Sequence, residues 1–273
     1  MSASVQNNWP RRGYADGPFG QVHYQVLGEG APLVLLHQAP MTSGQFDWVY
    51  EPLARRGICA IGIDMPGFGG SDPAPGVPRV EDYGQCVVPV LDALGIAQAA
   101  VLGHHTGSMA ATEAALQNPG RISAVILNGP MPLSAQERES FMANGHKRER
   151  DLVAVSGGAH FNEIFAARER LAAGSLPMER IGQFVVQALS GRGEYWHGHH
   201  AAYQYRHEDS LPLIRQRALI LTNTGDMIYG HAKRAHEIRP DLPFVALEGG
   251  GVDIVDQHSE AWAEVVAEFV KNG

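Results

Sequence analysis

The amino-acid sequence predicts an α/β fold with a mostly parallel sheet flanked by helices. Short apolar runs without polar alternation, such as Pro32–Leu36 and Ile58–Ile63, are typical of strands buried on both faces of a sheet. Helical patterns separate these runs at the spacing of strand–helix–strand units, which favour parallel strands. The alternation stops after residue 130 and resumes at residue 218, which indicates one sheet interrupted by an insertion.

The predicted strands are short and are bounded by turn-forming residues. They cover Gln21–Leu27, Pro32–Leu36, Ile58–Ile63, Ala99–Leu102, Ile122–Leu127, Ala218–Thr222 and Phe244–Leu247. The predicted helices cover Trp48–Arg56, Val80–Leu94, Ser108–Gln117, Gly230–Ile238 and Ser259–Val270. Gly57 and Gly95 follow the first two helices, where a left-handed residue commonly ends a helix. In the last helix Trp262, Val266 and Phe269 share one apolar stripe.

The insertion, Met131–Leu213, has helical patterns and no strand-like run. In open parallel sheets the functional loops lie at the carboxyl ends of the strands. We therefore expect the insertion to form a cap over those ends. The predicted domains are an α/β core, residues 1–130 and 214–273, and a helical cap, residues 131–213.

Composition excludes several classes of function. The chain has 273 residues, of which 44% are apolar and 18% charged, and a net charge of −8. Lysine and arginine form no long run, so we expect neither a nucleic acid nor a membrane surface as partner. No stretch approaches the ~20 apolar residues that span a bilayer. The polar start, Met1–Arg12, lacks the features of a signal peptide, so we expect a cytoplasmic protein with Cys59 and Cys86 reduced.

Unusual loops follow the predicted strands, and their order resembles that of the α/β-hydrolase family. The matching segments are His37–Pro40 for the HGxP oxyanion loop, Asp64–Ser71 for the DxxGxGxS loop, Gly103–Gly107 for the G-x-S-x-G nucleophile elbow, Asn223–Asp226 for the loop with the catalytic acid, and Gly249–Glu260 for the stretch with the catalytic histidine. The resemblance runs from about Gly20 to the end of the chain. It implies the family's fold with an inserted cap, and hydrolytic chemistry.

The departures from the family pattern concern the reacting groups. His105 stands where the family has its nucleophile, and Val252 stands where it has the catalytic histidine. Gln38 replaces the glycine of the oxyanion loop, and only Asp226 matches its family position. The resemblance therefore implies an atypical catalytic set, because an ordinary Ser-His-Asp triad cannot form from these residues.

An imidazole at the elbow can still do chemistry. His105 is long enough to reach into the space that the short Val252 leaves, and there it can contact Asp226. The carboxylate would fix the imidazole tautomer, and His105 would act as general base or as nucleophile. The backbone N–H of Thr106 and a donor at Gln38 would form the oxyanion hole, although Gln38 can also crowd it.

These residues predict a cofactor-independent enzyme acting on a small organic substrate. The resemblance favours hydrolysis of an ester, a lactone or a C–C bond. Two alternatives remain open. One is elimination, isomerisation or decarboxylation with His105 as a proton shuttle, and the other is a ligand-binding protein that has lost catalysis. No nucleotide-binding motif is present, so we expect no cofactor, and the oligomeric state, including a homo-oligomer, is open.

Several of the 13 histidines are candidates for a substrate pocket, together with aromatic residues near the loops. The candidate pocket residues are His37, His104, Phe68, Trp48, His197, His199, His200 and Tyr203. His258 is a second candidate for the base, and Asp253 is a spare acid beside Val252. His197 and His200, at i and i+3, could bind zinc with His105, but no established ligand spacing is present, so we expect no metal.

Overall fold

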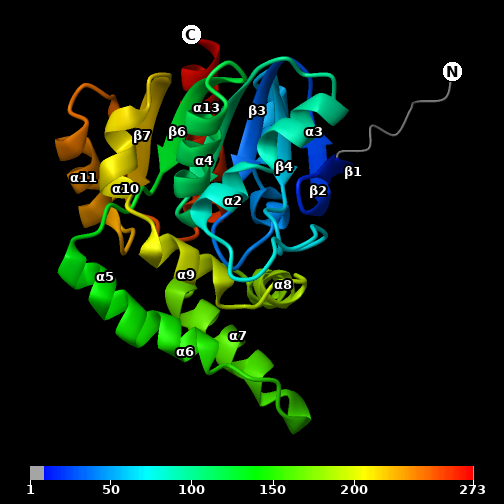
Figure 1. The fold of residues 1–273 in the computed structure, drawn as a ribbon, viewed down its shortest axis with the longest axis vertical. Helices are drawn as coiled ribbons and strands as arrows, with labels where there is room; N and C mark the ends of the chain where they lie inside the picture. Colours follow the sequence, from blue (N-terminus) through cyan, green and yellow to red (C-terminus); the bar gives the residue numbers. More distant parts are fainter. Residues whose placement is uncertain (1–8, 273) are drawn as a thin grey trace, which may run out of the picture.

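The computed structural model describes residues 9–272, and in these residues one twisted sheet lies between two layers of helices (Figure 1). Its strands are β1 (Arg11–Gly17), β2 (Gly20–Leu27), β3 (Ala31–Leu36), β4 (Ile58–Ile63), β5 (Ala99–His104), β6 (Ile122–Asn128), β7 (Arg217–Asn223) and β8 (Phe244–Leu247). Their order is β1-β2-β4-β3-β5-β6-β7-β8. Strands β3 to β8 pair in parallel, whereas β1 and β2 pair antiparallel. The predicted mostly parallel sheet is confirmed.

The chain leaves β3 toward one edge of the sheet and later returns to place β5 on its other side. This change of direction makes the carboxyl ends of β3 and β5 a topological switch point, where open α/β sheets bind their ligands. The loop His37–Pro40 follows β3, and His105 follows β5. The sheet order therefore brings these two segments together.

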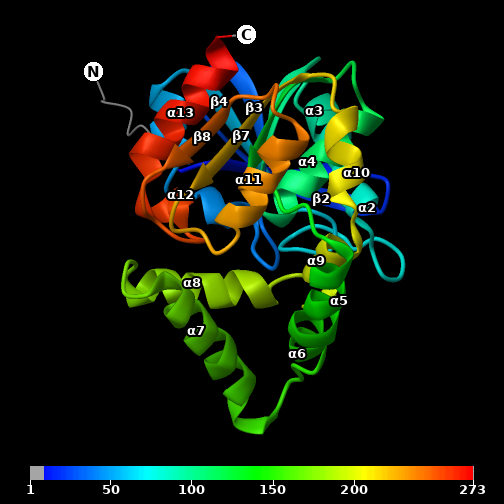
Figure 2. The ribbon, with the colours of Figure 1, turned by 90° about the vertical axis from the view of Figure 1, so that its left-hand side faces the viewer.

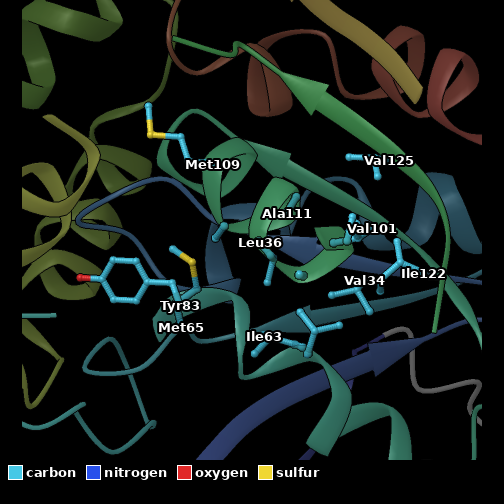
Figure 3. Packing of buried hydrophobic residues seen from close by; sticks show 14 of the residues in the cluster. Val34, Leu36, Ile63, Met65, Tyr83, Val101, Met109, Ala111, Ile122 and Val125 are labelled. Carbon is cyan, nitrogen blue, oxygen red and sulfur yellow. The ribbon is translucent and has the colours of Figure 1, made fainter. Parts of the chain in front are cut away.

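Side chains of the central strands alternate between two buried clusters. Leu33 and Leu35 of β3 pack on one face, and Val34 and Leu36 pack on the other. The first face is covered by α1 (Tyr50–Arg55), α12 (Ile254–Gln257) and α13 (Ser259–Lys271). The second face is covered by α2 (Val80–Gly84), α3 (Val87–Ala93), α4 (Thr106–Gln117) and α11 (Tyr229–Ile238). Figure 3 shows residues of the second cluster, among them Leu36 and Val101 of the strands and Ala111 of α4.

Two expectations about the elements are wrong. The single helix expected over Val80–Leu94 is two helices, because Pro89 lacks an N–H and its ring excludes a helical carbonyl at Gln85. Strand β1 was expected to be part of a polar leader, but it pairs along its whole length with β2. It buries only Ala15, so its sequence carries no clear alternation. Residues 1–8 of that leader lie outside the described residues.

The insertion contains helices only, in the part of the chain between β6 and β7 that the structure describes. They are α5 (Ala135–Phe141), η2 (Met142–His146), α6 (Lys147–Arg150), η3 (Ser156–Gly158), α7 (Ala159–Ala172), α8 (Met178–Leu189), α9 (His197–Gln204), α10 (His207–Ser210) and η4 (Leu211–Leu213). Figure 2 shows α5 to α9, called the cap helices below, together at one end of the sheet. The short α10 lies beside the core instead, where His207 contacts Thr112 of α4 at 3.1 Å.

No helix within residues 9–272 combines the length and the apolar character that crossing a bilayer requires.

Candidate functional site

The turn between β5 and α4 holds His105 in a strained conformation. Its φ of 49° and ψ of −111° fall in a region that residues with a Cβ rarely adopt. Glycines on both sides make this turn possible. A Cβ on Gly103 would lie 1.8 Å from the Gly107 carbonyl oxygen, and one on Gly107 would lie 2.1 Å from the Leu36 carbonyl oxygen. The elbow geometry expected from the sequence is therefore present, with an imidazole at its centre.

His105 contacts Asp226, the acid in the loop after β7. The distance from His105 Nε2 to Asp226 Oδ2 is 2.8 Å, and Asp226 Oδ1 accepts the N–H of Ile228 at 3.1 Å. Burial alone would raise the pKa of Asp226, but the His105 imidazole and the Ile228 N–H lower it to about 2. A carboxylate only accepts hydrogen bonds, so Nε2 carries the proton of neutral His105 and Nδ1 keeps its lone pair.

His104 lies behind the elbow and not in the cavity. Its ring stacks on His105, with centroids 4.3 Å apart and planes 14° apart. Its Nε2–H donates to the carbonyl oxygen of Val252 at 3.1 Å. Burial, and then the neighbouring His105, lower the pKa of His104 to about 3, so this ring stays neutral. The expectation that His104 lines the pocket is wrong, because its side chain is fully buried.

A cavity of about 410 Å³ lies between the strand ends and the cap helices. The core supplies His105, Thr106 and Val252 to its wall. Most of the remaining wall is apolar: Ala39, Pro40, Met41, Met131, Phe141, Leu152, Ile164, Ala167, Leu171, Ala188, Met227 and Ile228. A concave apolar site with a few converging polar groups is typical of small-molecule binding.

Two backbone donors are available beside His105. Thr106 begins α4, and its N–H makes no hydrogen bond to the described residues. The N–H of Gln38 is already engaged, because it donates to Gln45 Oε1 at 2.9 Å. The next N–H along, that of Ala39, makes no hydrogen bond to the described residues, and Ala39 lines the cavity. Thr106 and Ala39 are thus two cavity residues whose backbone N–H groups have no partner among the described residues, whereas the N–H of Gln38 is occupied.

His199 and Tyr203 of α9, two of the candidate pocket residues, line the cavity. Tyr203 stacks on Phe141 of α5, with centroids 4.9 Å apart. His199 Nδ1 lies 2.6 Å from Oε1 of Glu149. Burial disfavours the charged ring, but Glu149 outweighs this and raises the pKa of His199 above its ordinary value.

The candidates near the strand ends mostly serve the core. His37 is buried, with its Nδ1–H donating to the Gln38 carbonyl and its Nε2 accepting the N–H of Met65. Burial lowers the pKa of His37. Phe68 packs edge-on against His37 in the core cluster. Trp48 is 40% exposed at the surface, so none of the three lines the cavity.

The remaining cap and C-terminal candidates also lie elsewhere. His197 and His200 border other hollows, and His200 Nδ1 contacts His146 Nε2 at 3.2 Å. His105 borders neither of those hollows. Within residues 9–272, no three or more His, Cys, Asp or Glu side chains are grouped to hold a metal ion. His258 is exposed between α12 and α13, and Asp253 forms a buried ion pair with Arg168.

Some cavity residues were not predicted from the sequence. Arg168 comes from α7, Tyr195 precedes α9, and His231 lies in the first turns of α11. The cap residues carry no local signal, because only the packing of distant helices brings them to the cavity. His231 lies five residues after Asp226, on the helix that follows the acid loop, and no motif of the sequence singles it out.

Comparison with known proteins places the fold and site in a family. Residues 31–229 match the profile described as alpha/beta hydrolase fold, so the chain belongs to this family. The 2-hydroxy-6-oxononadienedioate/2-hydroxy-6-oxononatrienedioate hydrolase 2 of Pseudomonas putida is 36% identical over 114 residues, which are 40% of this chain and 40% of that protein. The match thus spans about two fifths of that relative's length.

Solved structures agree over nearly the whole chain. The esterase EaEST from Exiguobacterium antarcticum superposes with a TM-score of 0.80 at 19% identity, covering 94% of this chain and 98% of that one. The enol-lactonase from Burkholderia xenovorans LB400 superposes with a TM-score of 0.74 at 17% identity, covering 94% and 99%. These likenesses show the shared fold.

Proposed function

We propose that this protein is a cofactor-independent hydrolase of small organic substrates that uses His105 and Asp226 as its catalytic pair. The observation that carries the proposal is the 2.8 Å contact between His105 Nε2 and Asp226 Oδ2 at the wall of an apolar cavity. The bonds that we propose it cleaves are those of esters, lactones or ketones with an activated C–C bond. Membership of the alpha/beta hydrolase family supports hydrolysis over the other reactions.

In the proposed reaction the two imidazole nitrogens of His105 have different roles. Asp226 accepts Nε2–H and stabilises the imidazolium that forms during the reaction. Nδ1 removes a proton from water as the water oxygen attacks the substrate carbonyl carbon. The same Nδ1–H then returns the proton to the leaving group as its bond to that carbon breaks. General base action of this kind contributes on the order of 10²–10⁴ in rate.

The backbone donors suit the charge that develops on the carbonyl oxygen. Thr106 and Ala39 line the cavity together with His105, and their N–H groups have no partner among the described residues. They belong to the backbone, so replacing the family's nucleophile by histidine does not remove them. Donors fixed in place before reaction stabilise an oxyanion without reorganisation, which is often the largest single catalytic contribution.

The test is turnover of an activated ester, 4-nitrophenyl butanoate, by wild type and by His105→Ala and Asp226→Asn. We expect both variants to lose at least about 10²-fold in kcat/KM, because each removes one half of the dyad. His258→Ala is the matched control, since that imidazole is exposed away from the cavity, and it should keep wild-type turnover. Retained turnover in His105→Ala would refute the dyad.

Two further readouts separate the alternatives. A covalent acyl group on His105, detected by mass spectrometry after rapid quenching, would assign the nucleophile role, and turnover without it would assign the general base role. If ligands raise the melting temperature of wild type while no substrate is converted, the protein binds ligands without catalysing hydrolysis.

A further inference from the structure

A second imidazole–carboxylate pair lines the same cavity from the cap side. His199 lies on α9 and Glu149 lies on α6, and 2.6 Å separates His199 Nδ1 from Glu149 Oε1. The two residues are 50 positions apart in the chain. His199 lines the cavity wall together with Glu149, so the pair borders the space into which His105 also projects.

The other ring nitrogen of His199 is available to a ligand. Nε2 makes no hydrogen bond to the described residues, and it is not one of the buried polar atoms that lack a partner. The ring stacks on Tyr203, with planes 11° apart and centroids 5.7 Å apart, which fixes its orientation. Its side chain keeps 27% of its surface exposed. An imidazole held on one nitrogen by a carboxylate therefore presents its second nitrogen to the cavity.

Other charged residues line the cavity together with His199. Arg168 of α7 is neutralised by Asp253, whereas Arg148 of α6 and Glu163 of α7 lie exposed at the outer wall. His146 of η2 contacts His200 and not His199. Glu149 Oε2 is buried without a partner, so its charge is directed mainly at His199. Consistent with this, Glu149 raises the pKa of His199, which favours the imidazolium with a donor on both nitrogens.

We infer that His199, held by Glu149, binds an anionic oxygen on the non-reacting end of the substrate, and that the substrate class is esters or ketones carrying a carboxylate. This inference rests on the proposed function for the reacting end, which His105 would attack. The carboxylate accepts the Nε2–H of His199, while the apolar wall holds the carbon chain between the two ends. A charge-assisted hydrogen bond of this kind is among the stronger polar contacts available to a ligand.

The experiment compares two esters that differ in one charge. The mono-4-nitrophenyl ester of glutarate carries a free carboxylate, and 4-nitrophenyl butanoate does not. We expect wild type to favour the glutarate ester, and His199→Asn to lose about tenfold in kcat/KM on it, mainly through KM. The same variant should lose less kcat/KM on the butanoate, which has no carboxylate for His199 to bind. Glu149→Gln preserves the side-chain size and should weaken the preference in the same direction.

His197→Asn is the matched control, since it changes an imidazole on the same helix that does not line the cavity. It should leave the ratio of the two kcat/KM values unchanged. The assignment is overturned if wild type does not favour the glutarate ester. It is also overturned if His199→Asn lowers kcat/KM by the same factor on both esters.

A binding measurement separates this inference from the proposed function. N-(4-nitrophenyl)glutaramic acid and N-(4-nitrophenyl)butanamide are the corresponding amides, and calorimetry measures their Kd in His105→Ala. We expect the acid to bind more tightly than the neutral amide. Adding His199→Asn should reduce the ratio of the two Kd values about tenfold. If His105→Ala prefers the acid while wild type turns over neither ester, the carboxylate site stands and the hydrolase is refuted. Equal binding of both amides would refute the carboxylate site alone.

Discussion

At the scale of single residues, His105 combines two positions that the family normally keeps separate. It occupies the nucleophile elbow, and its ring reaches the acid that would otherwise hold a separate histidine. Val252 lines the cavity, and its carbonyl oxygen accepts a hydrogen bond from His104. The neutral His104 ring beneath His105 then limits the planes that His105 can adopt.

Gly129 gives the first test of this arrangement. A Cβ on Gly129 would lie 2.6 Å from His105 Cδ2, and its φ of +65° disfavours other residues. Gly129→Ala should therefore move the imidazole away from Asp226 and lower kcat about tenfold or more, since catalysis is sensitive to small displacements. Gly120→Ala, where a Cβ meets no atom within 4 Å, is the control and should retain activity. Unchanged kcat in Gly129→Ala would contradict the packing described for His105.

Asp226 links the site to stability in acid. Its pKa in the folded chain, about 2, is below the ordinary value of 3.8, chiefly because His105 offsets the effect of burial. A lowered pKa means that ionised Asp226 stabilises the fold above about pH 4, and that this contribution is lost as the pH falls toward 2. The contribution is on the order of 2 kcal/mol.

Urea unfolding between about pH 5 and pH 2.5 measures this contribution. The free energy of unfolding of wild type should fall more steeply over this range than that of Asp226→Asn, which has no carboxyl group at this position to titrate. Parallel curves for the two proteins would show that Asp226 is not stabilised by His105.

The sequence could predict the contact between His105 and Asp226, but only part of the cavity around it. His105 and Asp226 were found because each occupies a fixed place after a strand, and strand order brings those places together. Ala39 was missed because the hydrogen bond that engages Gln38 comes from the side chain of Gln45. His37 and Phe68 were wrongly placed in the pocket because a residue near a functional loop can equally point into the core.

At the scale of elements, two buried arginines attach the cap helices to the core. Arg168 of α7 pairs with Asp253, and Arg180 of α8 pairs with Asp256 at 2.7 Å. Arg180 also donates to the carbonyl oxygens of Gly44 and Gln45, at 3.2 and 3.1 Å. Since Gln45 binds the N–H of Gln38, helix α8 is connected to the loop that carries the Ala39 donor.

Arg180→Met tests how firmly α8 is attached. The side chain of Arg180 is almost fully buried, so its loss leaves the buried Asp256 carboxyl without its partner, and we expect a destabilisation of about 3 kcal/mol by chemical denaturation. Burial raises the pKa of Asp256 to about 7, and without Arg180 this pKa rises further. The double variant Arg180→Met, Asp256→Leu removes the unpaired carboxyl and should be more stable than the single variant. Arg206→Met removes an exposed pair with Asp209 and should cost less than about 1 kcal/mol. An equally small effect at Arg180 would contradict its anchoring role.

Prediction of elements succeeded where burial is strong on both faces. The central strands and α13 carry continuous or periodic apolar residues, and their expected ranges are close to the observed ones. Strand β1 buries few side chains, so its sequence has no strand-like apolar pattern. Its extended conformation comes from pairing with β2. The order of the cap helices around the cavity depends on contacts such as His199–Glu149. Such contacts join segments that lie far apart in the chain, and no local pattern predicts them.

At the scale of the whole molecule, the connection between α6 and α7 is the part of the cap farthest from the sheet (Figure 2). It contains the exposed residues Val153 and Val155 and the positive-φ glycines Gly157 and Gly158. The other glycine-rich connection, Gly191–Gly193, packs on the core, where the N–H of Gly193 donates to the Gly67 carbonyl at 2.8 Å.

Limited proteolysis with thermolysin should therefore cut first near Val153 and Val155, because exposed connections with few contacts open most readily. Cleavage between Gly191 and Gly193 should come later. Mass spectrometry of the first fragments identifies the site, and a first cut within the sheet strands would show that the cap is not the less stable part.

The choice of ring nitrogen has a further consequence for how the protein selects substrates. Because Asp226 engages Nε2, the lone pair left for chemistry belongs to Nδ1, the nitrogen bonded directly to Cγ and hence nearer the backbone. Only the χ1 and χ2 torsions separate this atom from a turn that is itself conformationally fixed. In the proposed reaction the water that Nδ1 activates must then lie close to the main chain at Thr106, and bulky groups next to the substrate carbonyl would collide with the elbow. The position of Nδ1 near the main chain thus favours substrates that are unbranched next to the carbonyl carbon.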